Sequence, residues 1–410
     1  MDLHIDGEQL QRDLEALAQF GRSPSGGWTR TALSVADADA RGYVAHRLRT
    51  LGLDIRHDEV GNLRARRPGR TPDAPVVMTG SHLDTVPSGG YLDGPLGVVG
   101  ALCAVEAIAR AKLTTQRPIE IVVFVGEEGS RFPRGTIGSA AVAGDLLVDE
   151  ILALRDADGI GFSEALATYR DTGPPLPARM APGTLHAFIE LHIEQGGVLE
   201  AAGVPIGAVT AIAGLVQHAV SFLGDANHAG ATPMALRRDA LCAAAEWLLG
   251  LERAAHEIGP GAVATVGKLV VSPGGKNIIP GRVDAICDLR ASDGALLDAL
   301  DAQVRALLSS TRPGIQVELR PLQRVEPGPM DERIVAAIEH AAEQTGRRSH
   351  RMVSGAIHDA LHMAHLGPSS MIFVPSLAGK SHCPEEASRS DDLITGTLVL
   401  AHTLADLAGA

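Results

Sequence analysis

Histidine and carboxylate side chains gather at the ends of strongly apolar runs in this chain. Six such residues fall at three places along the sequence: His82, Asp84, Asp93, Glu127, Glu128 and His192. A further histidine, His382, lies in a glycine-containing loop closer to the C-terminus. Imidazole and carboxylate groups bind zinc, manganese, cobalt and nickel. Because buried carboxylates are costly unless a cation faces them, these groups predict a divalent-metal site.

The number of candidate ligands indicates two metal ions. Five groups are available as direct ligands: His82, Asp93, Glu128, His192 and His382. One catalytic zinc normally takes three protein ligands, whereas two metals that share a bridging carboxylate use all five. Each group alone has an ordinary alternative, such as a solvated loop histidine or a surface pair of glutamates. Their shared position after runs too apolar for surface strands favours the metal site.

The elements expected around these residues form an α/β sheet. Apolar residues at 75–79, 119–125 and 371–374 predict buried strands, and the alternating pattern at 185–193 predicts another. Between the first two strands, a helix is expected over 102–112. Open α/β sheets bind ligands at the carboxyl edge of their strands, so the loops that carry these residues are expected to converge there.

The pattern changes near residue 213. Strands are expected at 216–223, 262–271, 281–290 and 315–320, with helices at 233–256 and 295–308. This order, βαββαβ, is typical of a ferredoxin-like domain. We therefore expect a mixed-sheet catalytic domain over 1–212 and 323–410, with residues 213–322 inserted as a second domain.

Composition excludes some classes of function. A length of 410 residues predicts two domains, and a net charge of -13 argues against nucleic acid or an anionic membrane as the main partner. Four cysteines without CxxC spacing indicate free thiols in a reducing compartment. No apolar run approaches membrane-spanning length, so a cytoplasmic location is expected.

Six motifs in order along the chain resemble the hydantoinase/carbamoylase family of amidohydrolases, part of the wider M20-type dinuclear metallopeptidases. They are GSHLDTVPSGGYLDGPLG at 80–97, EEGSRF at 127–132, LHIEQG at 191–196, NHAGATPM at 227–234, NIIPGR at 277–282 and SHCPE at 381–385. The resemblance implies that Asp93 bridges two metals, with His82 and His192 completing one site and Glu128 and His382 the other.

The resemblance also implies roles around the metals. Glu127, beside a ligand, matches the general base that takes a proton from the attacking water and returns it to the leaving nitrogen. Asp84 matches the carboxylate that accepts the second imidazole N–H of His82 and so fixes its tautomer.

The inserted domain is expected to supply substrate contacts and to act as a lid and dimerisation domain. By resemblance, Arg290 captures a substrate carboxylate, for which a guanidinium is well suited, and Gln217 and Asn277 donate to the same group. The alternative for Arg290 is an ion pair with Asp288 or Asp293. Gln217 and Asn277 are also ordinary residues for an exposed strand and a turn.

The resemblance further implies that His228 stabilises the oxyanion and that it comes from the partner subunit of a homodimer. By itself His228 is only a loop histidine. Three positions depart from the family pattern: Gly197 replaces the usual proline, Ala231 the usual threonine, and Ile357 the usual glycine. The segment of Ile357 normally lines the substrate pocket, so an isoleucine would narrow or reshape it.

The expected activity is metal-dependent hydrolysis of a linear ureido or amide C–N bond in a small substrate with a carboxylate. An N-carbamoyl-L-amino acid is the first expectation, with allantoate and β-ureidopropionate as alternatives. An M20 aminoacylase or dipeptidase is a further alternative, but those enzymes usually carry a carboxylate in place of His192. A catalytically inactive binding protein is the last alternative, although it would be expected to have lost ligands or the base.

Overall fold

The computed structural model describes residues 2–24, 26–167 and 174–410. The described chain divides into two compact units. The first contains residues 1–210, 330–352 and 358–410, and the second contains residues 211–329 and 353–357. The structure thus ends the first segment near the expected residue 212, but it assigns residues 323–329 and 353–357 to the second unit.

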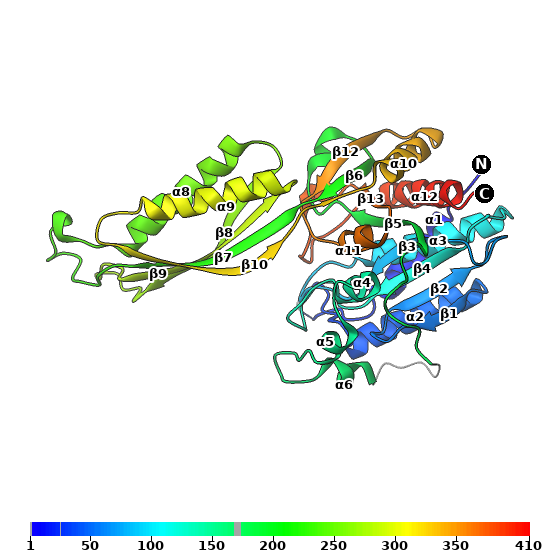
Figure 1. The fold of residues 1–410 in the computed structure, drawn as a ribbon, viewed down its shortest axis with the longest axis horizontal. Helices are drawn as coiled ribbons and strands as arrows, with labels where there is room; N and C mark the ends of the chain where they lie inside the picture. The colour runs from blue at the N-terminus through cyan, green and yellow to red at the C-terminus, as the bar shows by residue number, and fades with distance from the viewer. Residues whose placement is uncertain (1, 25, 168–173) are drawn as a thin grey trace. The chain divides into compact units, whose positions relative to one another are not determined.

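A nine-stranded mixed sheet forms the framework of the first unit (Figure 1). Its strands are β1 (Asp54–His57), β2 (Leu63–Arg67), β3 (Val76–His82), β4 (Ile119–Phe124), β5 (Leu185–Ile193), β6 (Ile206–Ile212), β11 (Gly328–Pro329), β12 (Ser349–Ser354) and β13 (Ser369–Val374). The order is β1-β2-β4-β3-β5-β13-β6-β11, and β12 also pairs with β6. The four neighbours β4, β3, β5 and β13 run parallel, and the flanking pairs are antiparallel. The mixed α/β sheet expected from the sequence is therefore confirmed.

Helices cover both faces of the central parallel strands. The first unit contains α1 (Gly7–Leu17), α2 (Val35–Thr50), α3 (Pro95–Arg110), α4 (Ile137–Ala143), α5 (Val148–Leu152), α6 (Phe162–Ala167), α7 (Val198–Ala202), α10 (Glu332–Gln344), α11 (Asp359–Leu366), α12 (Ser390–Leu407) and the 3-10 turn η2 (Leu377–Gly379). In β5, Leu191 packs towards α3 and α12, whereas the side chain of the preceding Glu190 accepts a hydrogen bond from the start of α11. Alternate residues of β5 thus face two helical layers, as expected of a fully buried strand.

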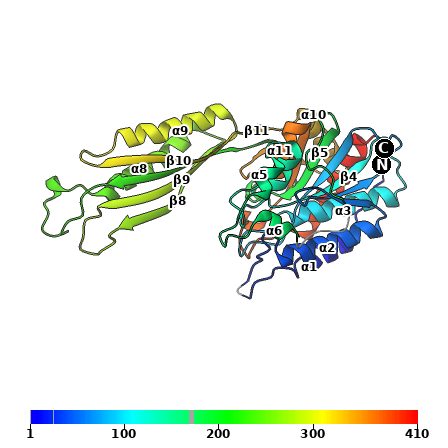
Figure 2. The same ribbon diagram turned by 60° about the horizontal axis from the view of Figure 1, so that its bottom comes forward.

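Helices α1 and α2 both lie against α3 (Figure 1, Figure 2). Helix α3 begins at Pro95, seven residues before the helix expected at 102–112, because proline at the first turn and Gly94 at φ +81° set the start of the helix. The residues between the expected strand at 75–79 and the expected helix at 102–112 are therefore strand up to His82, loop over 83–94, and helix from Pro95 onward. Between β4 and β5 the described residues form the three short helices α4 to α6.

The second unit contains the expected βαββαβ order (Figure 1). Its elements are β7 (Gly214–Leu223), the 3-10 turn η1 (Met234–Leu236), α8 (Ala240–Ile258), β8 (Ala262–Ser272), β9 (Arg282–Ala291), α9 (Gly294–Ser309) and β10 (Gln316–Val325). The four strands form one antiparallel sheet in the order β10-β7-β9-β8. Helix α8 begins at Ala240 and not at the expected 233, because Asp239 caps it by accepting from the main chain of Leu241 and Cys242.

Helices α8 and α9 pack against each other on one face of this sheet (Figure 2). Alternate residues of β9, such as Cys287 and Leu289, are buried in the core under the two helices. The residues between them, Asp288 and Arg290, lie on the opposite, more exposed face. In the described part of the chain, no helix is both long and apolar enough to cross a membrane.

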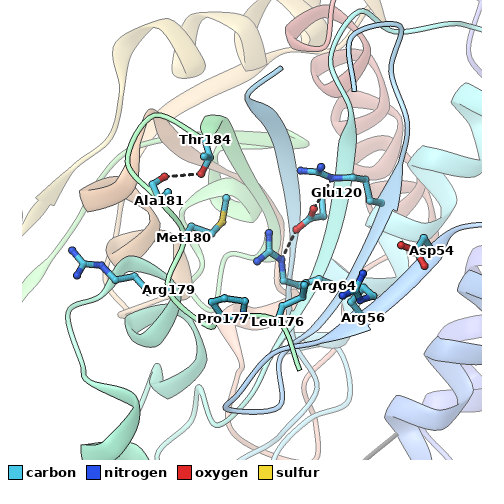
Figure 3. A pocket seen from close by; sticks show the side chains of 11 residues that line it. Asp54, Arg56, Arg64, Glu120, Leu176, Pro177, Arg179, Met180, Ala181 and Thr184 are labelled. Atoms are coloured by element: carbon cyan, nitrogen blue, oxygen red, sulfur yellow. Dashed lines mark hydrogen bonds and ion pairs between the residues drawn. The ribbon is translucent and has the colours of Figure 1, made fainter. Parts of the chain in front are cut away.

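A hollow of about 380 Å³ opens where the antiparallel edge of the large sheet meets the segment at 176–184 (Figure 3). Glu120 of β4 is buried beneath it and accepts from the Nε atoms of Arg64 and Arg66 on the neighbouring β2. One carboxylate therefore pairs with two guanidinium groups at the junction of β2 and β4.

Replacing Glu120 with glutamine is expected to destabilise the first unit. Removing one partner of a buried ion pair lowers the free energy of unfolding by roughly 3–5 kcal/mol. Because the side chain of Arg66 is 46% exposed, we expect a smaller loss of about 2–3 kcal/mol for Glu120→Gln. Urea unfolding would measure the change. Glu339→Gln is the matched control, since its partner Arg351 is 46% exposed and such pairs contribute less than about 1 kcal/mol. An equal loss of unfolding free energy in Glu120→Gln and Glu339→Gln would contradict a stabilising role for the buried ion pairs of Glu120.

Candidate metal centre

The candidate ligands lie at the carboxyl ends of four neighbouring strands. His82 is the last residue of β3, and His192 is the penultimate residue of β5. Glu127 and Glu128 follow β4, and His382 lies in the loop after β13. Because these four strands are parallel, their carboxyl ends meet at one edge of the sheet.

Asp93 lies at the centre of this group. Its Oδ1 atom is 3.5 Å from Nε2 of His82 and 3.1 Å from Nε2 of His192. Its Oδ2 atom is 3.1 Å from Nε2 of His382, which lies 3.6 Å from a carboxylate oxygen of Glu128. The donor atoms form two triads, each compact enough for one metal ion, and both triads contain Asp93.

The tautomers of the two buried histidines fit metal ligation. Nδ1 of His82 lies 2.9 Å from the main-chain oxygen of Asp84, and Nδ1 of His192 lies 2.8 Å from that of Ile193. Because a carbonyl only accepts, each Nδ1 carries a proton, and in the neutral ring Nε2 presents a lone pair. Both lone pairs face Asp93 Oδ1, and Nε2 of His82 is buried without a hydrogen-bond partner. Two lone pairs beside an anionic oxygen require a proton or a metal ion between them, and two imidazoles with a carboxylate are a donor set that suits a divalent metal.

Carboxylates crowd this edge of the sheet. Burial, together with repulsion from Asp93, raises the pKa of Glu128 to about 8. Burial also raises the pKa of Glu127 well above its usual value, although His82 opposes the shift. Glu127 is buried, and its Oε2 atom lies 3.8 Å from Nε2 of His82. A carboxylate thus lies beside the two triads without belonging to either.

The contacts of Asp84 differ in part from the expected ones. The N–H of His82 is directed at the main-chain oxygen of Asp84, and the carboxylate is 3.8 Å away. The carboxylate instead accepts from the main-chain N–H groups of Glu127 and Glu128, each at 3.2 Å. Asp84 therefore fixes the turn that presents these two glutamates. Sequence spacing could not indicate this role, because it depends on how the loop after β4 folds back.

Two residues near Asp93 were not identified from the sequence. Gln195 donates from Nε2 to Asp93 Oδ2 at 2.8 Å. Glu386 is buried and accepts from the main chain of Leu92 and Asp93 and from the hydroxyl of Ser381. Glu386 thereby ties the loop of Asp93 to the loop of His382. The sequence signal was their position, because Gln195 belongs to the motif at 191–196 and Glu386 directly follows the motif at 381–385.

Another pair of buried residues supports His192. Glu190 of β5 accepts from the hydroxyl of Ser81 and from the main chain of Ala360. The ring of His358 packs 4.5 Å from the ring of His192, and burial holds the pKa of His358 well below its usual value. A neutral imidazole and a hydrogen-bonded carboxylate thus fix the position of this candidate ligand. A charged residue inside a strand as buried as β5 was the sequence signal for Glu190.

The second unit carries three candidate substrate residues, two on neighbouring strands and one in the loop between β8 and β9. Gln217 on β7 is the cross-strand partner of Asp288 on β9 and donates to its carboxylate at 2.8 Å. Arg290 donates from Nε to the same carboxylate at 2.9 Å and from NH1 to the main-chain oxygen of Gly355. The ion pair with Asp288 that was the alternative for Arg290 is therefore present. Asn277 is exposed, and its main-chain oxygen accepts from Ala229.

His228 is exposed and has a defined tautomer. Its Nδ1 atom accepts from the main-chain N–H groups of Gly230 and Ala231 at 3.0 and 3.1 Å. A neutral ring that accepts at Nδ1 carries its proton on Nε2, so His228 presents an N–H donor outward. The loop is tied to the next motif, because His228 pairs with Ile278 in a β-bridge.

The mixed sheet and the histidine and carboxylate donors at its carboxyl edge define a metal-dependent hydrolase of the α/β class. The chain belongs to the family described as Peptidase family M20/M25/M40, whose model matches residues 78–406. It is 43% identical to an N-carbamoyl-L-amino acid amidohydrolase from Geobacillus stearothermophilus over 98% of this chain and 99% of that protein. It is 37% identical to allantoate amidohydrolase from Escherichia coli over 98% of each chain.

Among solved structures, a hydantoinase/carbamoylase family amidase from Burkholderia multivorans has a TM-score of 0.95 and 36% identity. The match covers 100% of this chain and 99% of that one. The resemblance stated from the motifs is therefore confirmed, and so is an amidohydrolase within the M20 family.

Proposed function

We propose that this protein hydrolyses the carbamoyl C–N bond of an N-carbamoyl-L-amino acid, giving the amino acid, carbon dioxide and ammonia. The observation that carries the proposal is the pair of donor triads that share Asp93, with Glu127 beside them. The similarity to N-carbamoyl-L-amino acid amidohydrolases supports the substrate class. Allantoate is the second candidate, because it is the substrate named for another relative of nearly full length.

In this proposal, His82 and His192 would hold one divalent ion, Glu128 and His382 would hold the other, and Asp93 would contribute to both sites. The ions would polarise the scissile carbonyl and lower the pKa of a bound water towards about 7. Zinc, manganese, cobalt and nickel all suit these ligands.

Glu127 moves the proton in this scheme. Its carboxylate takes the proton from the attacking water and delivers it to the nitrogen that leaves. Hydrogen bonds from the main chain of Glu127 and Glu128 to Asp84 keep the base in place. The Nε2–H group of His228 is the proposed donor to the oxyanion, supported by the tautomer that Gly230 and Ala231 impose.

The proposed binding group for the substrate carboxylate comprises Arg290, Gln217 and Asn277. Arg290 and Gln217 already converge on the carboxylate of Asp288, so their donors are spaced to share one carboxylate. A substrate carboxylate would compete with Asp288 for these donors. Ile357, in the same unit, is the residue we propose to restrict the substrate side chain, because it replaces the usual glycine.

The decisive assay compares substrates and metals. Purified protein is stripped with a chelator, reloaded with manganese or zinc, and incubated with N-carbamoyl-L-amino acids, allantoate, β-ureidopropionate and dipeptides. Metal-dependent ammonia release from the first group, faster than from the others, is the expected result. Absence of turnover on every ureido substrate would overturn the proposal, and cleavage of dipeptides alone would indicate an M20 peptidase.

Replacing Arg290 with alanine is expected to raise KM for N-carbamoyl-L-amino acids about 100-fold. The substrate carboxylate would lose a charge-assisted, two-pronged contact, which contributes roughly 1.5–3 kcal/mol. Steady-state kinetics with the acid and with its neutral amide analogue would check this, since only the acid should be affected. The control is Asp288→Asn, which leaves the guanidinium in place and should lower KM or leave it unchanged. A similar rise of KM for acid and amide would contradict the assignment.

We further propose that the protein is a cytoplasmic homodimer. All four cysteines are free, as expected in a reducing compartment. The exposed loop of His228, which would serve the partner's active site, supports the dimer. Light scattering would measure the oligomeric state, and mixing His228→Ala with Glu127→Gln protein should restore part of the activity if subunits exchange.

A further inference from the structure

A second cluster of metal-ligating side chains lies in the first unit, and it shares no residue with the triads around Asp93. Helix α11 carries His362 and His365 one turn apart, so both rings project from the same face. Both face Asp145, which follows the C-terminus of α4. Nδ1 of each histidine is 2.6 Å from the same oxygen, Oδ2 of Asp145.

The three donor atoms all lie within 4.8 Å of one another. Around a tetrahedral zinc ion, with bonds of about 2.0–2.2 Å, ligand atoms lie roughly 3.3 Å apart. The cluster therefore needs to open by less than about 1 Å to admit an ion. His365 can supply that movement, because its side chain is 57% exposed, and the same exposure gives an ion access.

The surroundings hold the other two ligands in position. Nε2 of His362 lies 3.0 Å from the hydroxyl of Thr136. With the ion on Nδ1, Nε2 would carry the proton and donate to this hydroxyl, which would fix the ring orientation as an outer hydrogen-bond acceptor does for a metal-bound histidine. The main chain of Asp145 donates to Ala140 in α4, and Gly144 at φ +83° directs the chain into this turn.

The charges also favour a cation. Nδ1 of both imidazole rings is aimed at the same carboxylate oxygen, Oδ2 of Asp145. Two imidazoles and one carboxylate favour zinc-like ions over magnesium or calcium.

We propose that Asp145, His362 and His365 form an accessory site for a third divalent ion of the zinc class, with water as the remaining ligand. The ion would clamp α11 to the turn after α4. Both elements reach the candidate active centre: the main chain of Thr136 donates to Glu127, and that of Ala360 in α11 donates to Glu190. The site would thus stabilise the elements behind the base without taking part in the reaction.

Zinc binding to tag-free, metal-stripped protein tests the proposal. The expected result is three zinc ions per chain in the wild type by equilibrium dialysis and elemental analysis, and two in His365→Gln. Zinc added beyond two equivalents should raise the melting temperature of the wild type and have no effect on the variant. His340→Gln is the matched control, since His340 is also exposed on a helix and its ring nitrogen hydrogen-bonds to the neighbouring Gln344.

The background variant Asp93→Ala separates this site from the proposed active centre. It should keep one zinc ion, and adding Asp145→Asn should remove that ion. This readout does not depend on catalysis, so it stands whether or not the proposed reaction is found. A zinc content of only two ions per chain in the wild type would overturn the proposal. A third zinc ion that remains bound in both His365→Gln and Asp145→Asn would also overturn it.

Discussion

Replacing Asp93 with alanine should release both metal ions of the active centre together and reduce turnover by more than about 1000-fold. One carboxylate oxygen of Asp93 faces His82 and His192, and the other faces His382. Without Asp93, each site retains two protein ligands, too few for a catalytic zinc. Elemental analysis after dialysis, together with the ammonia assay, would measure both effects.

His82→Ala is the informative comparison, because His82 belongs to only one triad. It should lose one ion preferentially and keep the other. Circular dichroism and urea unfolding would establish that both variants fold, since Asp93 also accepts a hydrogen bond from Gln195. Loss of a single ion in Asp93→Ala would contradict a bridging role.

Replacing Glu127 with glutamine should leave both metal ions bound and lower kcat by roughly 10²–10⁴-fold, the usual contribution of a positioned general base. The amide has nearly the same shape as the carboxylate, so the fold, the metal content and KM should change little. Metal analysis and steady-state kinetics on the same preparation would separate proton transfer from ligation.

The neighbouring Glu128→Gln variant provides the contrast to Glu127→Gln. Glu128 belongs to the triad of His382, so its loss should weaken one metal site, and activity should recover in part when metal is added in excess. Activity of Glu127→Gln that also recovers with added metal would assign Glu127 as a ligand and would contradict the base assignment.

The sequence was sufficient to place the five candidate ligands at one sheet edge. Each lies at or after the carboxyl end of a strongly apolar strand, as expected of central strands, and the carboxyl ends of parallel neighbours coincide. The βαββαβ order of the second unit was equally readable, because β7 and β9 alternate between buried and exposed residues. Strands β6 and β12 were not predicted. Few residues of β12 are buried, so it forms a strand because it pairs with β6 and not because its sequence alternates between apolar and polar residues.

Contacts that join distant loops could not be read from the sequence. Asp84 accepts hydrogen bonds from two main-chain N–H groups because the chain turns after β4. Asp145 lies beside His362 and His365 because α4 packs against α11. Helix starts were misjudged where local chemistry overrides the apolar pattern, as at Pro95 and at Asp239. The position of a residue in the sequence relative to a strand predicts the sheet edge at which it lies. The hydrogen bonds of the folded chain determine which groups its side chain contacts there.

The position of β13 has a consequence for how the protein matures. This strand comes late in the chain but lies between β5 and β6, and the loop that follows it carries His382 and Glu386. A nascent chain that has not yet extended past Ser369 lacks a central strand, one candidate ligand and the carboxylate that anchors the Asp93 loop. The proposed ligand set around Asp93 is therefore complete only once the chain extends past His382, so its assembly requires the C-terminal part of the polypeptide.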